Sequence, residues 1–132
     1  MRNLSQITDH PVDIIIPVYN GKAILRRCVT SVLERTGYPF KLIIVDDASP
    51  DQDFQHYLAS LEKDQRITIL RNDKNLGFVG SANRGMRQSS NDVVLLNSDT
   101  EVTTGWLEGL RACIGVHLRV ASASPLTSYG SI

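Results

Sequence analysis

Residues 93–99 read VVLLNSD, four aliphatic residues followed at once by polar ones and a carboxylate. A strand that is buried on both faces loses the alternation of apolar and polar residues, so this run predicts a buried strand over residues 93–96. Asp99 then lies just beyond the carboxyl end of that strand. Asn, Ser and Asp are also common in turns, because their side chains bond to the nearby backbone. The stretch alone leaves open whether Asp99 belongs to a turn or to a binding site.

The same combination of an apolar run and a polar ending occurs three times earlier in the chain. Aliphatic and β-branched runs predict further strands at residues 12–18, 41–45 and 67–70, with a weaker one at residues 120–123. Ser49 and Pro50 predict the start of a helix, as its N-cap and its first helical residue. Apolar residues at helical spacing predict four helices. Their expected buried residues are Ile24, Leu25, Cys28, Val29, Val32, Leu33, Phe54, Leu58, Leu61, Phe78, Val79, Ala82, Met86, Trp106, Leu107, Leu110, Cys113 and Ile114.

Strands that alternate with helices in this way predict an α/β fold, with a Rossmann-like, mostly parallel sheet and helices on both faces. The chain of 132 residues is long enough for one domain with a real core. Residues 1–11 are polar and are expected to form an N-terminal tail, with the domain over residues 12–132. The chain contains neither a signal-peptide core nor an apolar run near the roughly 20 residues that cross a bilayer. We therefore expect a cytoplasmic protein, with peripheral membrane attachment of the full-length protein, or an anchor outside these residues, left open.

Composition excludes several classes of function. Lysine plus arginine equals aspartate plus glutamate at 14 each, so no net field attracts nucleic acid. Cys28 and Cys113 form no CxxC pair, which argues against a zinc site or a disulfide scaffold. No GxxxxGK[ST] segment is present, which excludes a P-loop nucleotidase. The first predicted strand-to-helix turn contains Gly21 without the GxGxxG of dinucleotide-binding proteins.

The polar segments at the carboxyl ends of the predicted strands are the candidate site, since ligands of parallel α/β sheets bind at that edge. These segments contain three carboxylates, Asp46, Asp47 and Asp99, together with glycines that let a ligand approach the backbone. Carboxylates at strand ends suit Mg²⁺ or Mn²⁺, whose coordination is often completed by water and substrate phosphates. A receiver-type phosphotransfer domain also pairs aspartates at strand ends, but its strand-end lysine has no counterpart after Ala123.

Four segments together resemble a known family. They are VDIIIPVYNG (residues 12–21), LIIVDDASPD (42–51), NLGFVGSANRG (75–85) and LLNSDTEV (95–102). Their order and spacing resemble the nucleotide-sugar half of family 2 glycosyltransferases, which have a GT-A fold, over roughly residues 12–126. The resemblance implies a nucleotide-sugar donor of the UDP or dTDP type, a divalent cation, and transfer with inversion to a saccharide or lipid-linked acceptor.

The resemblance also implies roles for individual residues. Asn97-Ser98-Asp99 occupies the DXD position of the family, with asparagine as its first residue, which makes Asp99 the expected metal ligand. Tyr19 is a stacking surface for the base, and Asp47 is the carboxylate that bonds to it. The expected donor-binding residues are Pro17, Tyr19, Asn20, Asp46, Asp47, Gly77, Asn83, Arg84, Asn97 and Ser98.

The general base of the inverting reaction is not found in this sequence, and in the family it lies further downstream. We therefore expect this chain to supply the donor-binding portion of a transferase, inactive alone. A non-catalytic module that binds a nucleotide or a partner protein is the alternative. Trp106, Phe78 and Met86 are interpreted as core residues rather than ligand contacts.

Overall fold

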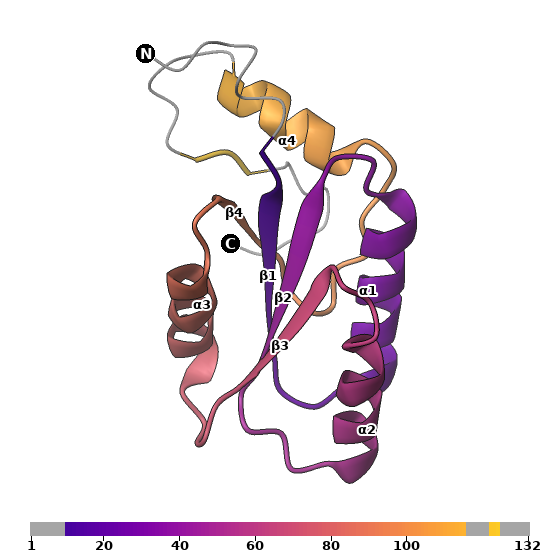
Figure 1. The fold of residues 1–132 in the computed structure, drawn as a ribbon, viewed down its shortest axis with the longest axis vertical. Coiled ribbons are helices and arrows are strands. Elements are labelled where there is room, and N and C mark those ends of the chain that lie inside the picture. The colour runs from indigo at the N-terminus through magenta and orange to yellow at the C-terminus, as the bar shows by residue number, and fades with distance from the viewer. Residues whose placement is uncertain (1–9, 116–121, 125–132) are drawn as a thin grey trace.

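The computed structural model describes residues 10–115 and 122–124, in which strands and helices alternate as predicted (Figure 1). The strands are β1 Val12–Val18, β2 Phe40–Asp46, β3 Ile67–Arg71 and β4 Asp92–Leu95. The helices are α1 Lys22–Arg35, α2 Gln52–Leu61, α3 Gly77–Gln88 and α4 Trp106–Gly115. No helix in the described part of the chain is both long and apolar enough to span a bilayer.

The four strands form one parallel sheet in the order β3-β2-β1-β4. From β1 the chain first builds outward through β2 to β3, and then returns to add β4 on the other side of β1. In sheets of this kind a crevice opens at the carboxyl ends of the strands where the direction of building reverses. The topology therefore places the expected ligand crevice between the ends of β1 and β4.

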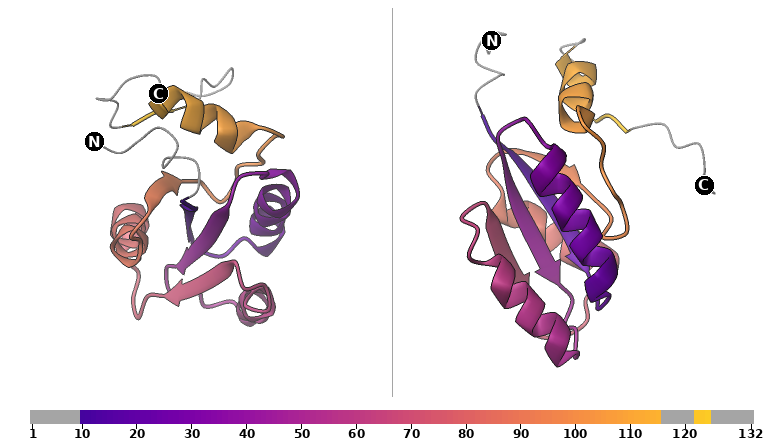
Figure 2. Two further views of the ribbon diagram at one scale, coloured as in Figure 1. Left: turned by 45° about the horizontal axis from the view of Figure 1, so that its top comes forward. Right: turned by 90° about the vertical axis from the view of Figure 1, so that its right-hand side faces the viewer.

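Helices cover both faces of the sheet, as predicted (Figures 1 and 2). α1 and α2 pack on one face, where most of the buried apolar side chains lie in one cluster that includes Ile14, Leu25, Leu42 and Phe54. α3 packs on the other face, over β1 and β2. Burial of aliphatic side chains on both faces accounts for the consecutive aliphatic residues 14–16 of β1 and 42–45 of β2.

The α3 helix contacts the sheet through small residues rather than through its large apolar ones. Ser81, Ala82 and Gly85 are buried, and a Cβ at Gly85 would lie 2.6 Å from Ile15 Cγ2. The prediction that Phe78 and Met86 pack in the core was wrong, since they are 51% and 40% exposed. Val79, at 69%, is also exposed. The close approach of α3 to the sheet leaves no room for large side chains between them.

The fourth helix lies at the amino ends of the strands, far from the candidate crevice (Figure 1). Trp106 packs against the core, as predicted, and donates its indole N–H to Thr36 Oγ1 over 2.9 Å. Arg111 pairs with Asp92 at the start of β4. Leu107 is fully buried, whereas Cys113 is exposed, so the prediction of a buried thiol at Cys113 was wrong.

Two local predictions need correction. The N-cap of α2 is Asp51, whose carboxylate accepts from the backbone N–H of Asp53 (2.8 Å) and Phe54 (3.1 Å), and not Ser49. β4 is partly exposed rather than buried on both faces, because only β1 pairs with it in the described sheet.

Some predictions fall outside the described residues. Val120 and Ala121 of the predicted fifth strand lie outside them, as do residues 1–9 of the predicted tail. Ser122 and Ala123 are described and belong to neither a helix nor a strand.

Candidate donor-binding site

Two adjoining pockets lie at the carboxyl edge of the sheet, where the topology predicts a crevice. The larger has a volume of about 290 Å³ and the smaller about 150 Å³. Both are lined by the end of β1, the first turn of α3 and the segment after β4. Their shared residues are Pro17, Tyr19, Phe78 and Ser98; the larger adds Asn20, Gly21, Ile24, Asn97 and Asp99, and the smaller adds Val18, Asp47, Gly77 and Ser81.

The turn from β1 to α1 presents its backbone and one amide to the larger pocket. Asn20 and Gly21 both have left-handed backbone conformations, with φ of 52° and 82°. The Asn20 N–H donates to Ser49 Oγ over 2.8 Å, which fixes the turn against the loop after β2. The side-chain oxygen Asn20 Oδ1 is buried and accepts no hydrogen bond from the described residues. A buried acceptor without a donor is costly, so this atom is suited to receive a hydrogen bond from a ligand.

Asp47 joins the loop after β2 to the start of α3. Its Oδ1 accepts from Asn72 Nδ2 (2.8 Å) and the Leu76 N–H (2.7 Å), and its Oδ2 accepts from the Gly77 N–H (3.0 Å). Burial alone would raise the pKa of this carboxyl, but these hydrogen bonds, with one from Ser81, lower it below its usual value. Asp47 is therefore ionised in the folded protein at neutral pH, and it fixes the helix start that lines the smaller pocket.

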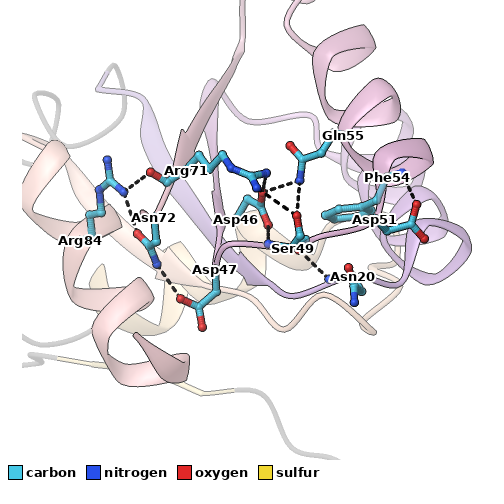
Figure 3. Close-up of polar contacts among 10 residues, drawn as sticks. All are labelled: Asn20, Asp46, Asp47, Ser49, Asp51, Phe54, Gln55, Arg71, Asn72 and Arg84. Carbon is cyan, nitrogen blue, oxygen red and sulfur yellow. Dashed lines mark hydrogen bonds and ion pairs between the residues drawn. The ribbon is translucent and has the colours of Figure 1, made fainter. Parts of the chain in front are cut away.

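Asp46 points away from both pockets into a polar network at the ends of β2 and β3 (Figure 3). Its side chain is fully buried. It accepts from Arg71 Nη1 (2.8 Å), Gln55 Nε2 (2.8 Å) and the Ser49 N–H (3.0 Å). The prediction that Asp46 binds the ligand therefore has no support in this geometry, since its carboxylate has the protein's own donors around it.

Asn83 and Arg84 also lie outside the two pockets. Arg84 Nη1 donates to the backbone oxygen of Arg71 and to Asn72 Oδ1 at 2.7 Å. Because Asn72 also bonds to Asp47, Arg84 belongs to the support behind the smaller pocket (Figure 3). The structure thus brings together eight of the eleven predicted residues and separates Asp46, Asn83 and Arg84 from them.

Ile24, predicted to be buried, is 44% exposed and lines the larger pocket. Phe78 is a second pocket residue that the sequence interpretation placed in the core. It lines both pockets together with Tyr19, and the two rings are 51% and 54% exposed. Half-exposed aromatic rings that flank a pocket offer flat surfaces on which a planar ligand can stack. The signal in the sequence was the glycine pair around it: Gly77, with φ of 74°, and Gly80 make α3 a poor candidate for a large apolar stripe.

Asp99 is exposed and lines the larger pocket with Asn97 and Ser98, as predicted. Within residues 10–115 and 122–124, no group of three His, Cys, Asp or Glu side chains lies close enough to hold a metal ion by itself. The lining of the two pockets contains two carboxylates, Asp47 and Asp99, and neither lysine nor arginine. Both oxygens of Asp47 already accept hydrogen bonds from the protein, so Asp99 is the carboxylate that fits a hard divalent cation, whose remaining ligands would come from water and a bound anion.

Comparison with known proteins identifies the family. Residues 13–123 match the family described as glycosyl transferase family 2. The chain belongs to this family. The glycosyltransferase GlyA of Streptococcus pneumoniae is 29% identical over 105 residues, which cover 79% of this chain and 15% of GlyA.

Solved structures share the GT-A fold of the domain. The crystal structure of GalNAc-T7 with UDP, GalNAc and Mn²⁺ superposes with a TM-score of 0.73 at 23% identity, over 80% of this chain and 21% of that one. The structure of residues 1–349 of TarS from Staphylococcus aureus, in complex with UDP-GlcNAc, gives 0.66 at 21% identity, over 80% and 31%. The domain therefore spans less than a third of each of these glycosyltransferases, and the likeness to them shows the fold.

Proposed function

We propose that this domain binds the nucleotide-sugar donor of an inverting, metal-dependent glycosyl transfer. The observation that carries the proposal is the convergence of Tyr19, Asn20, Asp47 and Asp99 on two adjoining pockets at the carboxyl edge of the sheet. These residues come from three separate strand ends, so only the folded sheet brings them together. A donor of the UDP or dTDP type is consistent with the UDP and UDP-GlcNAc present in the two similar structures.

The two pockets suit the two parts of such a donor. The base lies in the smaller pocket, where Tyr19 and Phe78 provide stacking surfaces and Pro17 and Gly77 complete the wall. The diphosphate and sugar lie in the larger pocket, where Asn20 Oδ1 accepts from a ligand hydroxyl and Asn97 and Ser98 provide further polar contacts. In this proposal Asp47 acts mainly through the start of α3, since three of its hydrogen bonds hold that turn.

A cation resolves an electrostatic conflict in this assignment. A diphosphate carries negative charge, whereas the lining residues of both pockets include two carboxylates and no basic side chain. We assign Mg²⁺ or Mn²⁺ to Asp99, which would hold it against the diphosphate oxygens. When bound, such a cation neutralises the negative charge that develops on the departing diphosphate.

The domain's own residues contribute binding and orientation to the reaction. The turn at Asn20 and the pinned start of α3 hold the donor between rigid elements, so that little ordering is needed when it binds. We assign no general base in this chain. Asp46 is buried among donors, and Asp47 lies at the base pocket with a lowered pKa, so neither is placed to take a proton from an acceptor.

Calorimetry tests the proposal directly. Uridine diphosphate and thymidine diphosphate are titrated into the wild-type protein with and without Mn²⁺, and then into Asp99→Ala and Asp73→Ala. Asp73 is an exposed carboxylate in the loop before α3 and serves as the matched control. We expect Mn²⁺ to strengthen diphosphate binding in the wild type and Asp73→Ala but not in Asp99→Ala. Binding that is indifferent to Mn²⁺ would instead support a nucleotide-binding module without catalysis, and no binding at all would contradict the proposal.

A further inference from the structure

The segment that contains Asp99 is an arch fixed at both ends. At one end Leu96 is buried and donates its backbone N–H to Ile15 O over 2.9 Å. At the other end Val102 is buried with 4% exposure. Between these two anchors the chain turns sharply, since the Thr100 N–H donates to Asn97 O over 3.1 Å. We call residues 97–101 the arch.

Helix α1 holds Val102, the downstream anchor, through both its backbone N–H and its backbone oxygen. The Val102 N–H donates to Ser31 Oγ over 3.0 Å, and the Val102 oxygen accepts from Arg35 Nη1 over 3.0 Å. Ser31 is buried, and its hydroxyl donates in turn to Cys28 O over 2.8 Å. The hydroxyl is thus oriented by its own helix, with its acceptor side toward the arch.

The same helix face contacts the upstream part of the arch. Cys28 is fully buried, and its thiol lies 3.7 Å from the Asn97 backbone oxygen as a donor. Arg27 Nε lies 3.5 Å from Glu101 Oε1, but both side chains are largely exposed, so this ion pair adds little. The buried hydrogen bonds at Val102 therefore dominate the attachment of the arch to α1.

We infer that Ser31 and Arg35 are positioning residues that set where Asp99 lies in the larger pocket. The inference rests on the proposed function, because it concerns the carboxylate assigned to the cation. Asp99 does not belong to a helix or strand that could fix its position, because β4 ends at Leu95. A helix that runs beside the arch is the rigid element that can fix it. Neither residue lines the two donor pockets, so both act through the Val102 backbone.

The variants separate positioning from general stability. Arg35→Met removes the donor and keeps an apolar stem, and Arg35→Lys restores a donor. Ser31→Ala removes the hydroxyl and leaves the Val102 N–H without its acceptor. Arg26→Met is the matched control, because Arg26 lies on the same helix and stacks on Tyr57 instead, with its guanidinium carbon 5.2 Å from the ring centre.

The measurement is uridine diphosphate affinity with and without Mn²⁺, with thermal unfolding run alongside. We expect Arg35→Met and Ser31→Ala to lose about tenfold in the Mn²⁺-dependent affinity, as groups that orient metal ligands commonly do. The affinity without Mn²⁺ should stay at the wild-type value, with Arg35→Lys nearer to wild type and Arg26→Met unchanged.

The outcomes distinguish the two claims. If Mn²⁺ does not strengthen binding in the wild type, the proposed cation role is wrong. If the wild type shows the Mn²⁺ effect and Arg35→Met and Ser31→Ala retain all of it, the inference about positioning is wrong and the proposed function stands. Equal losses with and without Mn²⁺ would also overturn it, because they indicate general weakening of the domain.

Discussion

Replacing Asp47 by asparagine removes one acceptor from a carboxylate whose two oxygens accept hydrogen bonds from Asn72, Leu76 and Gly77. An asparagine amide presents one oxygen and one NH₂ group. Whichever way the amide is oriented, at least one N–H of Asn72, Leu76 or Gly77 then faces another donor. Because Asp47 is only 5% exposed, water cannot easily replace the lost acceptor.

The magnitude follows from the contacts that change. A hydrogen bond to a charged group contributes about 1.5–3 kcal/mol. A carboxylate at a helix start adds about 0.3–1 kcal/mol through the helix dipole, and Asp47 accepts directly from the first residue of α3. We expect Asp47→Asn to lower the free energy of unfolding by about 2–4 kcal/mol, which corresponds to a fall in Tm of roughly 10 °C.

Urea denaturation at pH 7 measures this change, and Asp73→Asn is the matched control. Asp73 lies in the same loop and is exposed, so the control should stay within about 0.5 kcal/mol of the wild type. Acid titration gives a second measurement. The folded-state pKa of Asp47 is lowered, so its stabilisation is present above the usual aspartate pKa and is lost as the pH falls through the folded-state value. This acid-side loss should be smaller in Asp47→Asn.

Two results would refute the reasoning. One is an Asp47→Asn variant as stable as Asp73→Asn, which would mean that the three hydrogen bonds do not hold the start of α3. The other is an identical acid-side decline in the wild type and the variant, which would mean that Asp47 is not a group whose protonation destabilises the fold.

The remaining predictions concern the packing of α3, the accessibility of the two thiols and the stacking of a ligand on Phe78. Gly85→Ala should destabilise the domain by about 1–3 kcal/mol in urea denaturation, because its Cβ would overlap a β1 side chain. Gly109→Ala has open space around its Cβ and should stabilise the domain by up to about 1 kcal/mol. Equal effects of the two variants would contradict the close approach of α3 to the sheet. An aromatic disulfide reagent at pH 8 should modify the exposed Cys113 and spare Cys28, because burial raises the pKa of the Cys28 thiol to about 11. Rapid modification of both thiols in the native protein would argue against the burial of Cys28. Phe78→Ala should weaken uridine diphosphate binding about tenfold in calorimetry, because stacking of a base on an aromatic ring contributes about 1–3 kcal/mol, and it should change stability little. A large loss of stability would instead restore the interpretation of Phe78 as a core residue.

The architecture and the edge that holds the site could be predicted from sequence. Unbroken aliphatic runs separated by amphipathic segments require a parallel sheet, and the polar residues that follow each run must then meet at one edge. Tyr19, Asn20, Asp47 and Asp99 are therefore expected at one edge of the sheet, which is where the two pockets lie.

The orientation of neighbouring residues at a strand end could not be predicted in the same way. The sequence suggested that the second strand ends at Val45, which would leave Asp46 and Asp47 equivalent in a loop. In the structure β2 continues through Asp46, so the pleat turns that carboxylate toward Arg71 and the next one toward α3. One residue of strand length decides which of the two aspartates lines a pocket.

The error over α3 has a different cause. Helical spacing identified an apolar stripe through Phe78 and Met86, but spacing does not report how closely a helix approaches its sheet. The short distance at Gly85 makes small residues the contact surface, and the large ones are left on other sides of the helix.

The adjacent carboxylates of Asp46 and Asp47 also make the site sensitive to strand register. Asp46 pairs with Val18 on one side and Arg71 on the other, so one row of residues spans three strands at the edge of the pockets. A slip of β2 by one residue in one direction would place Asp47 against Arg71 and Ala48 at the start of α3, which would then lose its acceptor. A slip in the opposite direction would place Val45 against Arg71 and remove the ion pair. Only the observed register gives a carboxylate both to Arg71 and to the start of α3, so the two adjacent aspartates favour the correct pairing of β2.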